Sequence, residues 1–352
     1  MLLVLALGAA IWGLGWALRL PQRLRWAGIA VLYGAVLGLH LTLPGGHPLR
    51  QATGESAVLW LILGGVALVG LLYAGAVAAL KRRAKKMAPT PPLAPKPAGS
   101  FSDAELTRYA RHIVLRELGG PGQKRLKTAR VLVIGAGGLG SPALMYLAAA
   151  GVGTIGVIDG DTVDASNLQR QIIHAEARVG MAKVFSAQAA LEALNPHVTI
   201  RPYNRRLDED TAAALFADYD VILDGTDNFE TRYLANRTAV ALRRPLISGA
   251  LAQWEGQVSV FDPAHGAPCY QCIFPEAPAE GLAPSCAVAG VVAALPGVIG
   301  AMMAMEAIKV IADSGEPLRG AMLIYDGLYA ETRKFRLKPR PDCPICGGLH
   351  RA

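Results

Sequence analysis

The feature that most constrains this chain is an apolar run, residues 131–134, that leads directly into the loop Gly-Ala-Gly-Gly-Leu-Gly of residues 135–140. A helical stretch follows to Ala150, and a second apolar run ends at Asp159. Glycines let the backbone approach a phosphate, the N-terminus of a helix attracts its charge, and an acid at this distance accepts a ribose hydroxyl. The pattern therefore predicts a strand, loop, helix and strand that bind a nucleotide.

Apolar runs and helical stretches alternate beyond this loop. Strands are expected at residues 198–203, 220–224, 245–249 and 257–261, helices at 182–194, 208–216, 229–242 and 297–312, and a hairpin around 322–335. Ahead of the loop, Ser102 and Glu105 form a capping box at the start of a helix expected over 102–118. This alternation predicts an α/β fold with a Rossmann-like, mainly parallel sheet covered by helices on both faces.

Charge separates the chain into two parts. Residues 1–99 carry ten lysines and arginines and one acid, Glu55, whereas residues 100–352 carry 25 basic and 26 acidic side chains. A nucleic-acid-binding enzyme usually has its positive charge on the folded domain. The near-neutral domain therefore excludes nucleic acid as a partner.

The N-terminal third has the composition of membrane-spanning helices. Residues 2–18, 26–43 and 57–80 are uncharged apolar runs, and the last two suit a hydrocarbon core that needs roughly 20 residues. A signal peptide is the alternative for the first run, but no basic segment precedes it and no small-residue cleavage site closes it. We expect a membrane region over residues 1–86 with about three transmembrane helices, and two as the alternative.

Basic clusters orient these runs. Arg19, Arg23 and Arg25 lie between the first run and the second, and five more basic residues follow the third. Because basic loops stay in the cytoplasm, we expect a multi-pass protein of a bacterial-type inner membrane, with the large domain of residues 101–352 in the cytoplasm. The proline-rich residues 87–100 are expected to form a semi-rigid linker to that domain.

Residues beyond the glycine loop bear on which nucleotide it binds. By itself, a G-x-G-x-x-G loop before a helix is most typical of NAD or FAD. A triphosphate under attack needs cations to neutralise it and an acid to hold Mg²⁺, and Arg170, Lys183 and Asp227 supply these groups. The set favours ATP with Mg²⁺, and a membrane-tethered NAD-dependent oxidoreductase is the alternative.

From Arg108 onward the chain resembles the ThiF/MoeB/HesA family, relatives of the ubiquitin-activating enzymes, over about residues 100–350. The matching segments are residues 108–115, 135–140, 159–171, 179–183, 224–228, 248–250, 269–272, 286 and 305–309. The resemblance implies a Rossmann-like adenylation domain that uses ATP. The reaction it implies is adenylation of the C-terminal glycine of a small ubiquitin-like sulfur-carrier protein ending in Gly-Gly, with release of pyrophosphate.

The resemblance also assigns roles to single residues. Gly138 and Asp159 would hold the ATP phosphates and the ribose, and Asp227 would position Mg²⁺. Arg111 matches an arginine that one subunit inserts into its neighbour's site, which implies a homodimer. The catalytic set would be Arg111, Arg170, Lys183 and Asp227, with Cys286 as a further candidate. The nucleotide site would be completed by Ser166, Asn167, Leu168, Gln169 and Asn228, with Asn167, Arg170 and Lys183 contacting the phosphates.

Four cysteines form two C-x-x-C pairs, Cys269 with Cys272 and Cys343 with Cys346. Four thiolates in two such pairs suit a closed tetrahedral Zn²⁺ site, and a closed site is structural. A redox pair or disulfides are the alternatives, but a cytoplasmic domain disfavours stable disulfides and a redox site needs only one pair. Cys286 is left over. The resemblance places it where some relatives join covalently to the activated carrier, whereas a lone cysteine is often a small buried hydrophobe.

Two segments bear on the choice of carrier. Residues 272–278 and 284–286 resemble the molybdopterin-synthase (MoeB-like) branch of the family more than the thiamine branch. A MoaD-like carrier in molybdenum cofactor biosynthesis is therefore expected, with a ThiS-like carrier for thiamine biosynthesis as the alternative. Val288 and Met303 depart from the acid and the glutamine usual in the family. A further hypothesis is a non-catalytic tether that binds a sulfur carrier at the membrane.

Overall fold

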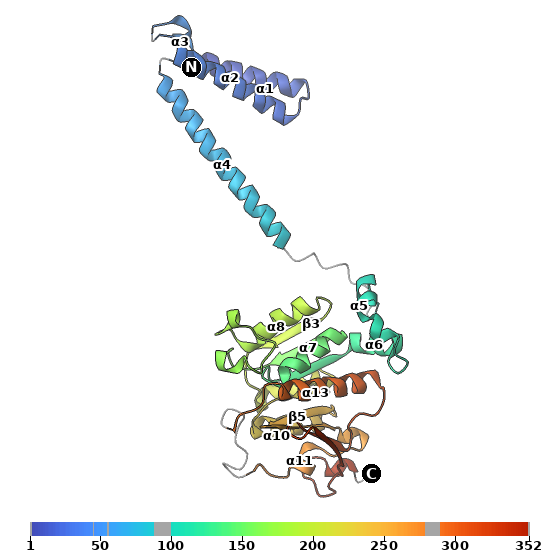
Figure 1. Cartoon of the computed structure of the whole chain (residues 1–352). Coiled ribbons are helices and arrows are strands. Elements are labelled where there is room, and N and C mark those ends of the chain that lie inside the picture. The colour runs from blue at the N-terminus through green and yellow to red at the C-terminus, as the bar shows by residue number, and fades with distance from the viewer. Residues whose placement is uncertain (1, 45, 55, 88–99, 279–288, 351–352) are drawn as a thin grey trace. The chain divides into compact units, whose positions relative to one another are not determined.

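The computed structural model of the chain describes residues 2–44, 46–54, 56–87, 100–278 and 289–350 (Figure 1). The chain divides into two compact units, Met1–Pro95 and Lys96–Ala352. The described part of the first unit is helical, and the second unit is built on one sheet of eight strands.

The sheet of the larger unit has the strand order β3-β2-β1-β4-β5-β6-β7-β8. Neighbours from β3 to β5 run parallel, and β6, β7 and β8 are added antiparallel. The strands are β1 (Arg130–Ile134), β2 (Thr154–Ile158), β3 (Thr199–Tyr203), β4 (Val221–Asp224), β5 (Leu246–Ala252), β6 (Glu255–Phe261), β7 (Ala321–Asp326) and β8 (Glu331–Arg336). The prediction of a Rossmann-like, mainly parallel sheet is confirmed.

Helices cover both faces of the sheet because successive side chains of a strand point to opposite faces. Val131 and Val133 pack into the hydrophobic cluster formed with α7, α8 and α13, whereas Leu132 and Ile134 pack into the cluster formed with α9, α10 and α11. These helices are α7 (Gly140–Ala150), α8 (Lys183–Leu194), α9 (Glu209–Ala217), α10 (Phe229–Ala241), α11 (Tyr270–Ile273) and α13 (Leu295–Ala312). Short 3-10 helices lie at Ala165–Asn167, Glu176–Arg178, Pro263–His265 and Gly347–His350.

Two helices precede the sheet where the sequence pattern predicted one over 102–118. Helix α5 (Asp103–Ile113) begins with the predicted capping box, since Ser102 and Glu105 each accept a hydrogen bond from the other's backbone N–H. The helix ends at Ile113, so the prediction was too long. Helix α6 (Gly119–Thr128) then follows. Its glycine-rich first turn is unfavourable for a helix, which is why the pattern did not predict it.

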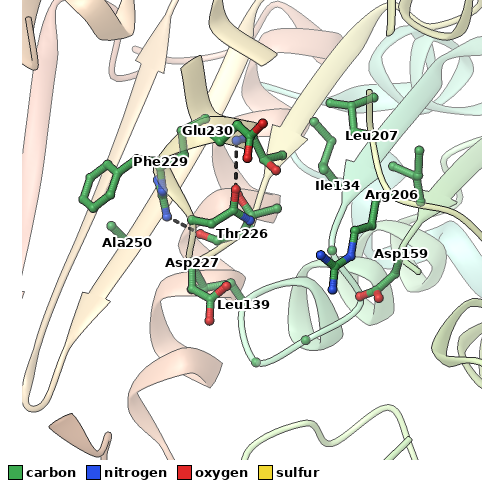
Figure 2. A pocket seen from close by; sticks show the side chains of 18 of the residues that line it. Ile134, Leu139, Asp159, Arg206, Leu207, Thr226, Asp227, Phe229, Glu230 and Ala250 are labelled. Carbon is green, nitrogen blue, oxygen red and sulfur yellow. Dashed lines mark hydrogen bonds between the residues drawn. The ribbon is translucent and has the colours of Figure 1, made fainter. Parts of the chain in front are cut away.

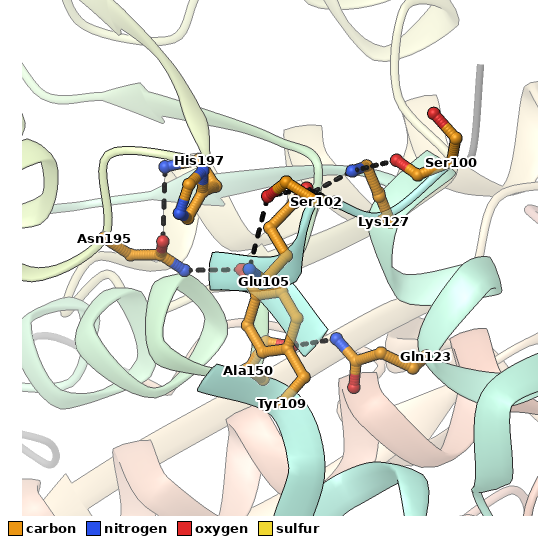
Figure 3. A network of polar contacts seen from close by, with 9 residues as sticks. All are labelled: Ser100, Ser102, Glu105, Tyr109, Gln123, Lys127, Ala150, Asn195 and His197. Carbon is orange, nitrogen blue, oxygen red and sulfur yellow. Dashed lines mark hydrogen bonds and ion pairs between the residues drawn. The ribbon is translucent and has the colours of Figure 1, made fainter. Parts of the chain in front are cut away.

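A polar network attaches α5 and α6 to the rest of the unit (Figure 3). The Tyr109 hydroxyl of α5 accepts a hydrogen bond of 2.8 Å from Asn195 Nδ2 at the end of α8. Gln123 Nε2 of α6 donates over 2.8 Å to the Ala150 carbonyl oxygen at the end of α7. Tyr109, Gln123 and Asn195 are all buried. A lost partner would leave a buried polar group unsatisfied, so the network fixes α5 in one position.

The N-terminal unit consists of α1 (Leu2–Ala17), α2 (Gln22–Thr42), α3 (Pro48–Thr53) and α4 (Ala57–Met87). Val4, Val36 and Trp60 form a small buried cluster between these helices. The Tyr33 hydroxyl donates to the Trp60 carbonyl oxygen over 2.7 Å. Many other large apolar side chains of this unit are exposed, which is the distribution expected of helices that face lipid.

Three helices of the described residues are long and apolar enough to cross a membrane: Gln22–Thr42, Ala57–Val77 and Leu295–Ala312. The last of these is α13, which contributes Ile299 and Met303 to the core of the larger unit and is therefore a core helix. The first predicted span, residues 2–18, forms α1. Its 16 residues extend over about 24 Å at 1.5 Å per residue, which is short for a hydrocarbon core of about 30 Å.

The contact between α13 and the start of α7 leaves no room for a side chain at Gly300. A Cβ atom there would lie 2.4 Å from both the Leu139 carbonyl oxygen and Pro142 Cγ. We expect Gly300→Ala to lower the free energy of unfolding by about 1–3 kcal/mol because of this overpacking. Gly297→Ala is the matched control, since a Cβ at Gly297 meets nothing within 4 Å. It should be neutral or stabilising by up to about 1 kcal/mol. Urea titration of both variants measures the difference, and equal stabilities would contradict the close approach.

Candidate nucleotide-binding site

A cleft of 1640 Å³ opens at the carboxyl ends of β1, β2 and β4. The chain passes from β1 to β2 and β3 on one side and later returns to β4 on the other, so the strand order reverses between β1 and β4. Open parallel sheets bind their ligands at such a point. The lining comes from the glycine loop, from the segment after β2, from the start of α8 and from the segment after β4.

The glycine loop turns so tightly that a side chain is excluded at Gly140. A Cβ atom there would lie 1.9 Å from the Gly135 carbonyl oxygen, and one at Gly225 would lie 3.2 Å from Gly140 N. Gly135 has a φ of 91°, in the left-handed region that favours glycine. Gly137 and Gly138 line the cleft. The loop therefore presents bare backbone at the N-terminus of α7, as a phosphate site requires.

Asp159 lines the cleft just after the end of β2 and is held by backbone groups. Its Oδ2 atom accepts a hydrogen bond of 2.8 Å from Ala136 N, and its Oδ1 atom accepts one of 2.8 Å from Asp161 N. Each carboxylate oxygen keeps a further lone pair that can accept a ligand hydroxyl. Figure 2 shows the carboxylate beside the guanidinium of Arg206, a cleft residue that sequence reasoning missed. Asp159 thus links β2 to the glycine loop as well as facing the cleft.

Two of the predicted cations line the cleft together with Asn167. Arg170 Nη2 donates to Asn167 Oδ1 over 2.8 Å. Lys183 is the first residue of α8, and its buried side chain places Nζ 3.0 Å from Asp161 Oδ2. Charges act over a longer range where water is partly excluded. Arg170 and Lys183, the latter paired with Asp161, therefore place two cationic groups at the cleft that can contact a polyanion.

Asp227 and Asn228 follow β4 and also line the cleft. Asn228 caps α10, because its Oδ1 atom accepts a hydrogen bond of 2.8 Å from Thr231 N. A Cβ atom at Gly225, two residues before Asp227, would lie 3.2 Å from Leu139 Cβ, so the loop after β4 packs against the glycine loop. A carboxylate in this place can hold Mg²⁺ against the oxygens of a bound phosphate.

Arg232 of α10 is a cleft residue that sequence reasoning missed. Its buried guanidinium donates to Ser248 Oγ over 3.0 Å, to the Gly249 carbonyl oxygen over 2.8 Å and to the Thr226 carbonyl oxygen. It also lies 3.7 Å from Asp224 Oδ2. These contacts attach the loop after β4 to β5. In the sequence Arg232 resembles any exposed helix arginine, so no signal marked it.

Several predicted site residues lie away from the cleft lining. They are Ser166, Leu168, Gln169 and Arg111. The Ser166 hydroxyl donates to Asp164 Oδ1 over 2.6 Å, so it is engaged in the local turn. Arg111 is exposed on α5. Cys286 lies outside the described residues, as does Val288.

The four cysteines of the two C-x-x-C motifs lie together at one buried position. Their sulfur atoms all lie within 4.8 Å of one another, at 3.9 Å for Cys269–Cys272, 3.6 Å for Cys269–Cys343 and 3.3 Å for Cys272–Cys346. A tetrahedral site with Zn–S bonds of about 2.3 Å requires sulfur separations of about 3.8 Å. Burial raises the pKa of Cys269 to about 12, which favours the protonated thiol. A bound divalent cation would instead favour the thiolate. The donor set therefore fits Zn²⁺.

Comparison with known proteins identifies the family. The sequence model of the ThiF family matches residues 109–345. A sulfur carrier protein adenylyltransferase of Thermus thermophilus is 49% identical over 70% of this chain and 93% of its own length. The SAMP-activating enzyme E1 of Haloferax volcanii is 45% identical over 70% of this chain and 91% of its own length. The probable adenylyltransferase/sulfurtransferase MoeZ of Mycobacterium tuberculosis is 49% identical over 72% of this chain, which spans 65% of MoeZ.

Solved structures have the same fold. Escherichia coli MccB, determined with ATP, superposes with a TM-score of 0.57 and 23% identity over 64% of this chain and 69% of MccB. PaaA superposes with a TM-score of 0.59 and 23% identity over 75% of this chain and 81% of PaaA. With a family match over most of the larger unit and relatives of nearly half-identical sequence, the chain belongs to the ThiF family and is an adenylyltransferase.

Proposed function

We propose that the protein uses ATP to adenylate the C-terminal glycine carboxylate of a small ubiquitin-like sulfur-carrier protein and releases pyrophosphate. The observation that carries this proposal is the cleft, in which a bare glycine loop is combined with Arg170, Lys183 and Asp227. A dinucleotide cofactor bound through its diphosphate needs less positive charge than a triphosphate under attack. The relative from Thermus thermophilus, named for activity on a sulfur carrier protein, supports the choice of substrate.

The proposed reaction needs no general base. A C-terminal carboxylate is ionised at neutral pH, so its oxygen attacks the α-phosphorus of ATP directly while the bond to pyrophosphate breaks. The main barrier is the repulsion between two anions. Arg170 and Lys183 reduce this repulsion and stabilise the departing pyrophosphate. Mg²⁺, which Asp227 would hold, supplies further positive charge at the phosphates when bound.

Four further residues of the proposed nucleotide site line the same cleft: Gly138, Asp159, Asn167 and Asn228. Gly138 and its neighbours would hold the phosphates through backbone N–H groups, and Asp159 would accept a ribose hydroxyl. Asn167 would contact the phosphates. Asn228 lines the cleft while capping α10, so its contribution would be to shape the loop that carries Asp227.

We further infer that the protein is a homodimer in which Arg111 of one subunit enters the cleft of the other. Arg111 is exposed and does not line the cleft of its own chain. Its helix is fixed by the buried contact between Tyr109 and Asn195, so the guanidinium would be presented at a defined place.

A MoaD-like carrier in molybdenum cofactor biosynthesis is the proposed substrate, and a ThiS-like carrier of thiamine biosynthesis is the alternative. Residues 272–278 support the first choice by their resemblance to the molybdopterin-synthase branch. Cys286 would then be dispensable for adenylation, because the nucleotide chemistry requires no thiol.

The division of the chain into a membrane region (1–86), a linker (87–100) and an adenylation domain (101–352) is part of the same proposal. The length and apolar composition of α2 and α4 support insertion into a membrane. Basic residues follow the first and the third apolar runs, and they support a cytoplasmic location for the adenylation domain.

Carrier-dependent ATP–pyrophosphate exchange tests the proposed activity. We expect the full-length protein in detergent to catalyse exchange with a carrier ending in Gly-Gly, and Asp227→Ala to lower the rate by about a hundredfold or more, since the metal charge is lost from the phosphates. Glu331→Ala removes an acid on β8, outside the cleft lining, and should leave the rate unchanged. Absence of exchange with every carrier of both pathways would falsify the proposal. Protection of the protein from thermal unfolding by NAD but not by ATP would favour the oxidoreductase.

Metal analysis tests the cysteine site. We expect one Zn²⁺ per chain, and we expect Cys346→Ser to lose most of it because a tetrahedral thiolate site needs all four ligands. The thermal midpoint should fall by at least about 5 °C, since bound metal contributes directly to folding. Cys286→Ser is the matched control and should keep its Zn²⁺. Unchanged metal content in Cys346→Ser would rule out the site.

Reporter fusions test the membrane topology. We expect alkaline phosphatase inserted after Gly46, between α2 and α3, to be active, because this loop would lie outside the cytoplasm. A fluorescent protein fused after Ala352 should fold in the cytoplasm. A reporter at the N-terminus distinguishes three spans, which place it outside, from two, which place it inside. An inactive phosphatase after Gly46 would overturn the predicted orientation.

A further inference from the structure

The glycine loop rests on a buried imidazole that no part of the proposed chemistry uses. His174 Nε2 lies 2.9 Å from the Ala136 carbonyl oxygen, and His174 Nδ1 lies 2.9 Å from Ser186 Oγ of α8. His174 is 8% exposed and Ser186 is fully buried. The ring therefore joins the loop to α8 across the interior, on the side away from solvent.

The partners of His174 determine its tautomer. A carbonyl oxygen can only accept a hydrogen bond, so Nε2 must carry the proton that bonds to Ala136. Nδ1 of the neutral ring is then an acceptor, and the Ser186 hydroxyl donates to it. Ser186 thus keeps the proton on the nitrogen that faces the loop.

Burial, assisted by two nearby cations, keeps the His174 ring neutral. Burial is the main cause that lowers the pKa of His174, and the charges of Lys183 and Arg178 lower it further. The hydrogen bond to Ala136 and the charge of Asp159 act in the opposite direction. The net shift lowers the pKa of His174 from 6.5, so the ring is neutral at pH 7. Protons bind the unfolded chain more tightly, and the free energy of unfolding therefore decreases as the pH falls below 6.5 towards the pKa of the folded state.

The bond to Ala136 fixes the direction of the next amide. A trans peptide places the carbonyl oxygen and the following N–H on opposite sides, and the described chain has no cis peptide bond. With the Ala136 oxygen directed at His174, the Gly137 N–H points away from the ring. Gly137 lines the cleft, and its N–H donates no hydrogen bond within the described residues. On the other side of Ala136, the backbone N–H is held by Asp159.

We propose that His174 is a positioning residue that directs the Gly137 N–H into the cleft, where it donates to a phosphate oxygen of the bound nucleotide. This inference rests on the proposed function, because it requires ATP in the cleft. His174 does not touch the nucleotide. It contacts only the backbone of the loop. Asp159 accepts from the Ala136 N–H and His174 donates to the Ala136 carbonyl oxygen, so the peptide groups on both sides of Ala136 are fixed.

Substitutions that separate shape from hydrogen bonding test this proposal in the full-length protein. His174→Phe keeps a ring of similar size but removes the donor to Ala136, and it should raise the Kd and KM for ATP about tenfold, as expected for loss of one well-aligned hydrogen bond to a charged group. The KM for the carrier should not change. His174→Gln retains a side-chain N–H donor at nearly the position of Nε2, and it should restore most of the affinity for ATP.

A control separates positioning from stability. Leu191→Ala removes a fully buried side chain from the same helix as Ser186, without altering the hydrogen bonds of His174. It should lower the thermal midpoint at least as much as His174→Phe while leaving the Kd for ATP within about twofold. The ¹⁵N NMR spectrum of the wild type should show a protonated Nε2 and an unprotonated Nδ1 in His174, and Ser186→Ala should weaken this preference.

Three outcomes would overturn the inference, and they are distinguishable. Equal Kd values for ATP in the wild type and His174→Phe would exclude the positioning role and leave the proposed function intact. No binding of ATP by the wild type would remove both. A similar loss of ATP affinity in Leu191→Ala and His174→Phe, without rescue in His174→Gln, would show that stability alone accounts for the effect.

Discussion

The close backbone contact within the glycine loop is the constraint on which the cleft depends. Only a glycine at position 140 lets α7 begin directly behind β1, since a Cβ there would lie 1.9 Å from the Gly135 oxygen. Gly225 packs against Gly140 in turn, which brings the end of β4 next to the end of β1. One loop therefore does both: Gly137 and Gly138 leave its backbone bare at the cleft, and Gly140 lets the loop that carries Asp227 pack at its side.

Much of the fold was predictable because its elements have their own periodicity. The apolar run of β1 is buried on both faces, as a central parallel strand requires, and the capping box marked the start of α5. The prediction failed where local sequence opposes the final structure. Helix α6 begins with Gly119, Gly120 and Pro121 and is held by a tertiary contact from Gln123. Such a contact joins distant segments and leaves no periodic signal.

The site residues likewise divide into those with a signal in the local sequence and those that depend on tertiary contacts. Arg170, Lys183 and Asp227 stand in an ordered set of motifs, so their convergence on one cleft could be expected from the sequence. Arg232 and His174 could not, because their roles depend on contacts made by segments far from them in the chain. Residues chosen only as neighbours in a motif, such as Ser166 and Leu168, lie outside the cleft lining. In a 3-10 turn, successive side chains point in different directions, so adjacency to Asn167 did not ensure a shared role.

The distribution of charge indicates what would attach the adenylation domain to a membrane. Residues 100–352 are nearly neutral, with 25 basic and 26 acidic side chains, so anionic headgroups would attract this unit only weakly. Attachment in the proposed arrangement would therefore depend on α2 and α4 rather than on the domain surface. A tether of this kind requires no basic lipid-binding face on the enzyme. The cleft lining carries basic and acidic side chains together, so Arg170 and Lys183 would act on the phosphates as individual cations rather than as part of a large positive surface.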